Sequence, residues 1–527
     1  MLISEMAAMD LLEMAGSMAS RVVGGLYLLV VAGLTFYGLH RSILLARYRR
    51  PSPAPPTSGF STLPAVTVQV PMFNEAPVAQ RVIDAVCQLD YPQKRLQIQI
   101  LDDSTDRSAD LVRRRVAHWQ AQGIRIELHH RLDRRGYKAG ALADGLETAG
   151  GTLIALFDAD FVPKPDFLKR MVAIFNDPKV GCVQARWDHL NRSDNFLTRA
   201  QAIFRDAHSF LEQHGRHRSG LWIYFNGTAG IWRRAAIESA GGWQHDTLSE
   251  DVDLSYRAQL AGWKFVYLPL LGCPAELPPQ IEAFRIQQHR WCKGITQVAM
   301  KLLGKILRSN ASWRVKLEVW FHLTQPLVNL LITLLGGLLY PALLLNFDPA
   351  RQGSAGSLML GVMVCLLGTV SGAAFFAAGQ QARRTLGGTG ASGAAMLLQI
   401  PWVMALGIGM SIHNSFAVLE ALLGHESPFV RTPKYNGADP ADTQLAGSGV
   451  KRWLPVVETA CGLYLLGCTA ASLSQSWSMP ASPFLLLLAS GYLYVGFAGL
   501  RARFRNQSQK HKSSDSKVKS LISNVEF

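Results

Sequence analysis

Long apolar segments without a single charged residue constrain this chain more than any other feature of its sequence. A helix needs about 20 apolar residues to cross a bilayer. Four segments reach that length, and the last is long enough for two helices. The sequence therefore predicts one N-terminal span and about four C-terminal spans. The segments are the residues between Arg21 and Arg41, residues 319–347, residues 352–382 and residues 459–500.

Basic residues after the first span set the expected orientation. Arg41, Arg47, Arg49 and Arg50 follow the apolar run directly, and positively charged flanks of a span stay in the cytoplasm. The sequence therefore predicts an integral protein of the plasma (inner) membrane. The part of the chain between the first span and the second is expected in the cytoplasm.

A further uncharged segment, residues 385–419, is rich in glycine and is interrupted by a proline and by polar residues. If the last hairpin begins near Lys451 and ends at the basic tail, both in the cytoplasm, the preceding segment must begin and end on that side. We therefore expect residues 393–422 to form interfacial or re-entrant helices. The alternative is one plain crossing, which would place the loop around Arg431 outside.

The balance of charges is strongly basic. The chain has 53 lysine and arginine residues against 38 aspartate and glutamate residues, a formal charge of +15. Basic residues beside membrane spans face anionic lipids, so the lipid bilayer is an expected partner. Nucleic acid is not an expected partner, because the sequence has no basic helix and no aromatic RNA-binding motif.

Between the first span and the others, residues 64–310 have the pattern of one soluble unit. Strand-like runs alternate with amphipathic segments, which is typical of a mostly parallel α/β sheet. Residues 1–50 hold the first span, 51–63 form a Pro- and Ser-rich linker, and 311–500 form the membrane region. Residues 501–527 are predicted to be a basic, disordered tail. The expected strands are 65–75, 96–106, 124–130 and 151–161, and the expected helices are 80–89 and 108–122.

Polar pairs follow three of the predicted strands. Ligands of open α/β sheets bind at the edge where parallel strands have their carboxyl ends. We therefore expect these side chains to share one binding site. The pairs are Asn74–Glu75, Asp102–Asp103 and Asp158–Asp160.

Asp158 and Asp160, with one residue between them, suit a divalent cation that prefers oxygen ligands. Mg²⁺ or Mn²⁺ usually keeps waters and substrate phosphate oxygens as its remaining ligands. Acidic pairs are also common in ordinary turns, so the pair by itself fits either interpretation.

The segment SEDVDLSYRAQLAGWK, residues 249–264, is predicted to begin a helix with Ser249 as its N-cap. Glu250 and Asp251 would then stand at the positive end of the helix dipole. Taken alone, these two acids could serve only to stabilise the start of the helix.

The segment QIEAFRIQQHRWCKG, residues 280–294, is predicted to be helical, with Gln287, Arg290 and Trp291 on one face. An arginine offers a planar fork for phosphate oxygens, and an indole face suits stacking against a sugar ring. The same pattern fits an amphipathic helix at the membrane surface, and both interpretations can hold together.

Taken together, these motifs resemble the processive, membrane-integrated members of glycosyltransferase family 2, the cellulose, chitin, hyaluronan and mannan synthases. The signature of that family is D, D, D and then Q-(Q/R)-x-R-W. Its counterparts here are Asp103, the pair Asp158 and Asp160, Asp251, and residues 287–291.

More local matches resemble the cellulose synthase-like branch that makes β-mannan, glucomannan or β-glucan. They include GYKAGAL at 136–142 and FNGTAGIWRRAAI at 225–237. Two departures are Ser249, where the family usually has threonine, and Cys292–Lys293, where mannan synthases tend to have Ser-Cys. The hydroxyl of a serine retains the capping function of the threonine.

The resemblance implies a GT-A fold for residues 64–310 and a role for each matched residue. Asp251 would act as the general base, with Glu250 beside it in the catalytic centre. Asp158 and Asp160 would hold Mg²⁺ or Mn²⁺. The residues expected to bind the nucleotide sugar are Glu75, Asp103, Lys138, Asp158, Gln287, Arg290, Thr432 and Lys434. Those expected to bind the acceptor are Trp291, Asn226, Gly227 and Thr228.

The segment SPFVRTPKYN, residues 427–436, resembles the F-x-V-T-x-K gating loop of cellulose synthases. Phe429, Thr432 and Lys434 are in place, whereas Arg431 replaces the valine. Pro433 is a further departure, which would stiffen the loop. As chemistry, a threonine and a lysine on a mobile loop suit closure over a diphosphate. An ordinary basic loop between helices is the alternative.

The resemblance implies an inverting, membrane-integrated hexosyltransferase that polymerises a β-1,4-glucan or mannan and moves the growing glycan across the membrane. The expected donor is UDP-glucose or GDP-mannose. One alternative is a non-processive enzyme that adds one sugar to a membrane lipid. Another is a catalytically silent scaffold or transporter, which the retained carboxylates and Arg290 oppose. Aromatic residues that could line a glycan channel, or equally mark the membrane interface, are Trp320, Tyr340, Trp402 and Trp453.

Overall fold

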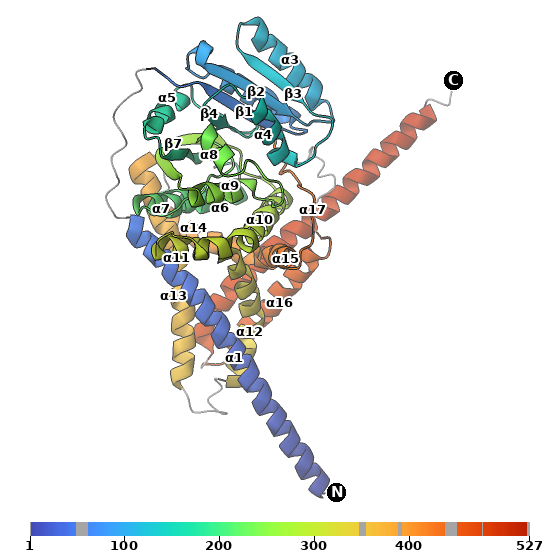
Figure 1. The fold of residues 1–527 in the computed structure, drawn as a ribbon. Coiled ribbons are helices and arrows are strands. Elements are labelled where there is room, and N and C mark those ends of the chain that lie inside the picture. Colours follow the sequence, from blue (N-terminus) through green and yellow to red (C-terminus); the bar gives the residue numbers. More distant parts are fainter. Residues whose placement is uncertain are drawn as a thin grey trace.

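The computed structural model describes the backbone of residues 2–48, 62–346, 355–387, 393–437, 451–476 and 478–523. Residues 51–61 of the predicted linker and residues 352–354 of a predicted span lie outside the described residues. The chain forms a sheet-containing unit that sits on a layer of long helices (Figure 1).

The sheet has seven strands in the order β3-β2-β1-β4-β6-β5-β7. Its first half confirms the four strands expected from the sequence, and these run parallel to one another. β6 is antiparallel to both of its neighbours, while β5 and β7 are parallel to each other. The mostly parallel α/β fold is therefore confirmed. The strands are β1 (Val66–Met72), β2 (Leu96–Asp102), β3 (Ile126–His130), β4 (Leu153–Leu156), β5 (Val180–His189), β6 (Gly230–Arg233) and β7 (Lys264–Ala275).

Helices cover both faces of the sheet and give it two apolar cores. On one face the alternating side chains of β1, such as Val68, pack against helices that include α2 and α3. On the other face Ile154 and Leu156 of β4 pack against helices that include α4 and α8. The sheet is thus fixed from both sides, so its carboxyl edge is a rigid base for a site. The helices of this unit are α2 (Ala76–Cys87), α3 (Ser108–Ala121), α4 (Tyr137–Glu147), α5 (Phe167–Val172), α6 (Phe196–Ala207), α7 (His214–Arg218), α8 (Arg234–Ser239) and α9 (Glu250–Leu260).

Five helical segments in the described part of the chain are long and apolar enough to cross a membrane, which marks an integral membrane protein. Their number is the predicted one, but Leu398–Leu422 is among them and the predicted span at 352–382 is not. Residues 355–387 of that region do form one long helix. The other candidates are Met18–Tyr48, Trp313–Leu345, Leu454–Leu473 and Met479–Arg505.

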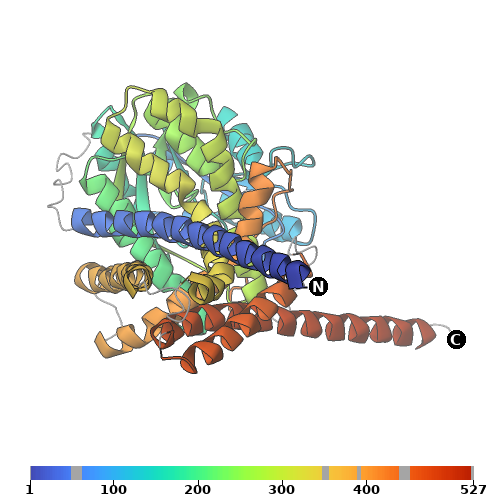
Figure 2. The same cartoon turned by 90° about the horizontal axis from the view of Figure 1, so that it is seen from below.

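The other helices lie beneath the sheet unit and cross one another at different angles (Figures 1 and 2). Residues 393–422, expected to be interfacial or re-entrant, form two helices that meet at Met410. Of the apolar window in this pair, 67% is buried inside the protein, and the re-entrant path stays a prediction. The helices are α1 (Leu2–Tyr48), α10 (Ile281–Arg308), α11 (Trp313–Thr324), α12 (Val328–Asn346), α13 (Ala355–Gly387), α14 (Gly393–Gly409), α15 (Ser411–Leu422), α16 (Leu454–Leu473) and α17 (Ser482–Ser523).

The predicted disorder of residues 501–527 is wrong for the described part of that tail, because α17 continues to Ser523. The sequence has no glycine or proline after Gly499, so nothing in it forces the helix to end. In Figure 1 this end of α17 projects away from the rest of the protein.

Buried ion pairs join the sheet unit to the apolar helices. Arg285 on α10 is fully buried, pairs with Glu458 on α16, and donates to the carbonyl of Val495 at 2.9 Å. Glu318 on α11 accepts from Arg216 on α7 at 2.9 Å and pairs with Arg47 at the end of α1. Since a buried charge without its partner is costly, these pairs hold the two layers in one arrangement.

Candidate active site

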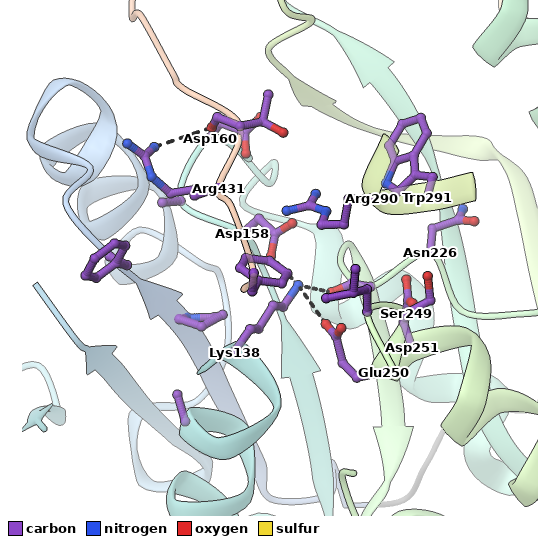
Figure 3. A pocket seen from close by; sticks show the side chains of 18 of the residues that line it. Lys138, Asp158, Asp160, Asn226, Ser249, Glu250, Asp251, Arg290, Trp291 and Arg431 are labelled. Atoms are coloured by element: carbon purple, nitrogen blue, oxygen red, sulfur yellow. Dashed lines mark hydrogen bonds and ion pairs between the residues drawn. The ribbon is translucent and has the colours of Figure 1, made fainter. Parts of the chain in front are cut away.

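A cavity of about 190 Å³ opens at the carboxyl edge of the sheet, where the predicted polar pairs meet. Glu75 follows β1, Asp103 follows β2, and Asp158 and Asp160 follow β4. The remaining walls come from α4, β5, α6, the segment before β6, the start of α9, α10 and the loop before α16. Figure 3 shows part of this lining. The predicted residues that line the cavity are Glu75, Asp103, Lys138, Asp158, Asp160, Asn226, Gly227, Glu250, Asp251, Arg290, Trp291, Thr432 and Lys434.

Two predicted site residues do not line this cavity. Gln287, expected to bind the donor, lies on a larger cavity next to it, one helical turn before Trp291. Thr228, expected to bind the acceptor, is fully buried, and its hydroxyl accepts a hydrogen bond from the Asp158 backbone N–H at 2.8 Å. Thr228 therefore positions Asp158 and has no surface to offer a ligand.

The Asp103 end of the cavity combines a fixed carboxylate with a stacked arginine. Arg131 donates to both Asp103 oxygens, at 2.8 and 2.7 Å. The guanidinium of Arg134 lies 3.3 Å from the ring centroid of Phe73. Asp102, next to Asp103, accepts from the Ser104 backbone N–H at 3.1 Å, which stabilises the turn after β2. A flat heterocycle could be held here by stacking and by hydrogen bonds.

Lys138, on α4, links three walls of the cavity. Its ammonium donates to Asp158 at 2.6 Å and to the Gly227 carbonyl at 2.9 Å, and it lies 3.9 Å from Glu250. Figure 3 shows this side chain reaching toward Asp158 and Glu250. Opposite charges nearby keep the pKa of Lys138 raised although burial by itself would lower it. The lysine therefore stays charged and suits contact with a phosphate.

Asp251 differs from the other acids because none of the described cations lies within ion-pair distance of it. Its Oδ1 accepts from the Val252 backbone N–H at 2.8 Å, and its other oxygen faces Gly227. A Cβ at Gly227, where φ is +81°, would lie 2.8 Å from Asp251 Oδ2, so only glycine fits. Burial, and next the charge of Glu250, raise the pKa of Asp251 well above the usual range of an aspartate. A carboxylate of this kind suits a general base.

The start of α9 is as predicted, with Ser249 at the N-cap, but the Ser249 hydroxyl makes no capping hydrogen bond. The reason is the close approach of α10. A Cβ at Gly294 would lie 2.2 Å from the Ser249 oxygen, so the serine side chain is used to pack against that helix.

Asp160 is the residue that best fits a metal ion. Its Oδ1 is buried and has no hydrogen-bond partner, while Oδ2 is 2.7 Å from the ammonium of Lys434. Asp158 lies two residues away on the same cavity wall. Among the described residues, no group of three or more His, Cys, Asp or Glu side chains could hold a metal by itself. The pair therefore fits a cation that takes its other ligands from phosphates and water.

The predicted gating loop, residues 427–436, contributes Phe429, Arg431, Thr432 and Lys434 to the wall of the cavity. Arg431 pairs with Glu75 at 3.1 Å, and Lys434 reaches Asp160. Arg290, on α10, lies 4.7 Å from the ring centroid of Phe429. Thr432 is buried, and its hydroxyl has no hydrogen-bond partner. The loop therefore places two cations and a free hydroxyl beside the acids of the sheet edge.

A second cavity, of about 490 Å³, joins the first and extends between the sheet unit and the apolar helices. Both cavities share walls formed by Trp187, Arg205, Tyr224, Arg290 and Trp291. None of the four aromatic residues predicted as candidates for a glycan channel lines it. Trp320, for example, stacks on Tyr37 with ring centroids 6.1 Å apart, and it is Tyr37 that lines the cavity.

Sequence motifs gave no reason to select Trp187, Arg205 or Tyr224. They come from β5, α6 and the segment before β6, and they meet only through the fold. Trp187 and Trp291 have ring centroids 6.3 Å apart. The one local signal in the sequence is the aromatic side chain of Trp187 near the end of β5.

These residues form an arrangement suited to one class of reaction. Asp251, Asn226 and Trp291 lie on one side of the cavity, and Asp160 and Arg431 lie across from them (Figure 3). One side thus holds a carboxylate that can accept a proton. The other holds cations and a pair of aspartates that suits a metal ion. Such a cavity can activate a hydroxyl while it stabilises a departing diphosphate.

Comparison with known proteins agrees with this chemistry. Residues 64–294 match a family model described as glycosyltransferase like family 2. Glucomannan 4-beta-mannosyltransferase 9 of Arabidopsis thaliana is 35% identical over 428 residues, which cover 78% of this chain and 76% of that protein. Glucomannan 4-beta-mannosyltransferase 2 of the same plant is 45% identical over 256 residues, 48% of each chain. The matched part thus spans about half the length of several of these relatives.

Among solved structures, the chain is similar to a mannosyltransferase from Pyrobaculum calidifontis in complex with GDP-Man and Mn²⁺. The sequence identity is 22% and the TM-score is 0.48, with 77% of this chain and 100% of that chain covered.

Proposed function

This chain belongs to glycosyltransferase family 2 and resembles its cellulose synthase-like members, and we propose that it is an inverting polymerase of a β-linked polysaccharide. The polymer would be of the β-1,4-mannan, glucomannan or glucan type. The observation that carries this proposal is one cavity that joins Asp251 and Trp291 to Asp160 and Lys434. Glucomannan 4-beta-mannosyltransferases at up to 45% identity support a mannose-containing product.

The donor, GDP-mannose or UDP-glucose, would lie along the sheet edge. Its base would occupy the Asp103 end, where Arg134 is stacked on Phe73. Its diphosphate would lie near Lys138, Arg290 and Lys434, whose charges compensate phosphate oxygens. The sugar would then point toward Asp251, with its anomeric carbon between the leaving diphosphate and the acceptor.

The acceptor is proposed to be the hydroxyl at the end of the growing glycan. Trp291 would stack on the terminal sugar, and Asn226 and Gly227 would contact it. Asp251 takes the proton of this hydroxyl, whose oxygen attacks the anomeric carbon from the face opposite the diphosphate. The new C–O bond forms as the bond to the diphosphate breaks, so an α-linked donor gives a β-linkage.

Mg²⁺ or Mn²⁺ fits the pair Asp158 and Asp160, as the free, buried Oδ1 of Asp160 supports. When bound, such an ion would neutralise the negative charge of the diphosphate. The chain's own part in the same task falls to Arg290 and Lys434, which stabilise the departing group. Lys138 holds Asp158 in place from the other side.

The larger cavity is proposed as the exit path for the glycan. It begins at Trp291 and runs past Tyr37 and His40 toward Leu488 among the apolar helices. Its walls mix aromatic rings with polar groups, which suits a chain of sugars. We propose that the sheet unit faces the cytoplasm and that the protein lies in the plasma (inner) membrane.

The experiment that tests this function incubates purified protein in lipid nanodiscs with labelled GDP-mannose or UDP-glucose and Mg²⁺ or Mn²⁺. Products are sized and then digested with β-1,4-mannanase and β-1,4-glucanase. A ladder of long glycans that one of these enzymes degrades would support the polymerase. A single sugar extracted with the lipid fraction would support transfer to a lipid instead, and no incorporation would reject both.

The fall of the glycan synthesis rate at acidic pH is expected to follow protonation of the Asp251 carboxylate. The base must be deprotonated to accept a proton, so the rate falls as the pH drops through its pKa. Because burial raises that pKa, we expect the fall to begin well above the value of about 3.9 of a free aspartate. The measurement is kcat/KM for glycan synthesis between pH 4.5 and 8.5, with the fold monitored at each pH. A rate that stays flat down to pH 5 would contradict the assignment of Asp251 as the base.

A further inference from the structure

Arg205, near the end of α6, contacts two indole rings. Its guanidinium carbon lies 3.8 Å from the ring centroid of Trp187 and 5.0 Å from that of Trp291. A cation over an indole face is attracted by the electrons of the ring. Arg205 therefore has a fixed place beside the tryptophan that the proposed function assigns to the acceptor.

This place is the junction of the two cavities. Arg205 lines the smaller cavity together with Asp251, and it lines the larger one together with His208 and Glu212. The helix changes at this point, because α6 continues directly into the π-helical turn His208–Gln213. Such turns often occur at functional sites, where they redirect side chains. Arg205 is therefore one of the residues beside which a glycan would move from Asp251 into the larger cavity.

Arg205 has donors but no acceptors for them among the described residues. Its Nε is buried without a hydrogen-bond partner, and no carboxylate lies within ion-pair distance of the guanidinium in the described part of the chain. Burial lowers its pKa to about 10, so the group still carries its charge at neutral pH. A buried cation with unused N–H groups is costly unless a ligand supplies acceptors.

The geometry points to Arg205 as an acceptor-binding residue, which holds the sugar directly behind the terminal unit of the growing chain. This inference rests on the proposed polymerase function. The guanidinium would donate to two neighbouring hydroxyl or ring oxygens of that sugar, while Trp291 stacks on the terminal sugar in front of it. The ligand class is a neutral, β-linked oligosaccharide.

The shape of the group supports this class of ligand. A guanidinium presents its N–H donors in a rigid plane, which matches two acceptors on adjacent carbons better than a lysine ammonium does. Sugar rings offer such pairs of hydroxyls along one edge and C–H groups on their faces. Arg205 can donate to the hydroxyl pairs, and an indole ring can pack against the C–H groups.

The test compares Arg205→Met and Arg205→Lys with the wild type, using β-1,4-mannotetraose and cellotetraose as added acceptors. We expect Arg205→Met to raise the acceptor KM by about tenfold to a hundredfold and to shorten the products. Arg205→Lys should recover only part of the affinity, because it keeps the charge but not the planar fork. Arg199→Met is the matched control, since Arg199 is exposed on the same helix.

Deoxygenated acceptors distinguish sugar binding by Arg205 from a purely structural role, in which Arg205 only packs against the indoles. Removing one hydroxyl from the second sugar of the tetraose should weaken binding to the wild type by about tenfold. The same removal should have little effect on Arg205→Met, because this variant lacks the guanidinium that would donate a hydrogen bond to that hydroxyl. Equal penalties in both proteins at every hydroxyl of that sugar would overturn the inference.

Tryptophan fluorescence measures binding of the tetraose without glycan synthesis. A failure of this inference can therefore be distinguished from a failure of the proposed function. If the wild type makes no glycan yet binds the tetraose through Arg205, the proposed polymerase is rejected and the binding site stands. If it makes glycan with an acceptor KM that neither Arg205 variant changes, the polymerase stands and the inference is rejected. Thermal unfolding in nanodiscs checks that both variants fold.

Discussion

Asp251→Asn is expected to reduce glycan synthesis by about 100- to 10,000-fold while nucleotide binding changes little. An amide has nearly the size of the carboxylate, and it can still accept from the Val252 backbone N–H. It cannot take the proton of the acceptor hydroxyl. The end of the cavity proposed for the donor's base, at Asp103 and Arg131, makes no contact with Asp251, so its contacts remain.

The measurement for Asp251 is the turnover of labelled donor together with the dissociation constant of the nucleoside diphosphate. Asp246→Asn is the matched control, because this acid is five residues away and well exposed, and its partner Lys301 keeps a second partner at 2.8 Å in Asp253. Near-normal turnover in Asp251→Asn would reject the base. A loss of nucleotide binding as large as the loss of turnover would show that Asp251 holds the donor instead.

The first half of the sheet could be predicted from the sequence because its strands are apolar runs that end at acids. The second half could not. β6 has only four residues, and β7 contains Pro269 and Pro274. Proline is compatible with β7 because this strand is at the edge of the sheet, but edge position is decided by the fold and leaves no signal in the local sequence.

In the candidate site, too, some residues could be predicted from the sequence and others could not. Residues in short motifs, such as Asp160 and Trp291, could be predicted, and the structure brings them into one cavity. Arg131, which holds Asp103, and Arg205 could not be predicted, since their partners are far away in the sequence and no motif includes them. Thr228 shows the opposite error, because a motif names a residue without saying whether its side chain faces the ligand.

The second large effect is expected for Asp160→Asn, with a loss of glycan synthesis of about 1,000-fold at saturating Mg²⁺ or Mn²⁺. An amide oxygen is a weaker and uncharged ligand for a hard cation. The same change removes the ion pair to Lys434, which frees the loop over the cavity. Both effects act on the stabilisation of the departing diphosphate, so the rate should fall more than the donor affinity.

The two effects of Asp160→Asn can be separated, because only one of them depends on the metal. Lys434→Met removes the ion pair but leaves both metal-type carboxylates, so its activity should still rise with added Mn²⁺ and vanish with EDTA. Asp160→Asn should need a much higher Mn²⁺ concentration or show no response at all. Asp144→Asn is the control for a lost surface charge, since that side chain is 61% exposed and pairs with Arg131. If Asp160→Asn responded to Mn²⁺ at the same concentrations as the wild type, Asp160 would be no metal ligand, and its function would be to hold Lys434 and thereby the loop.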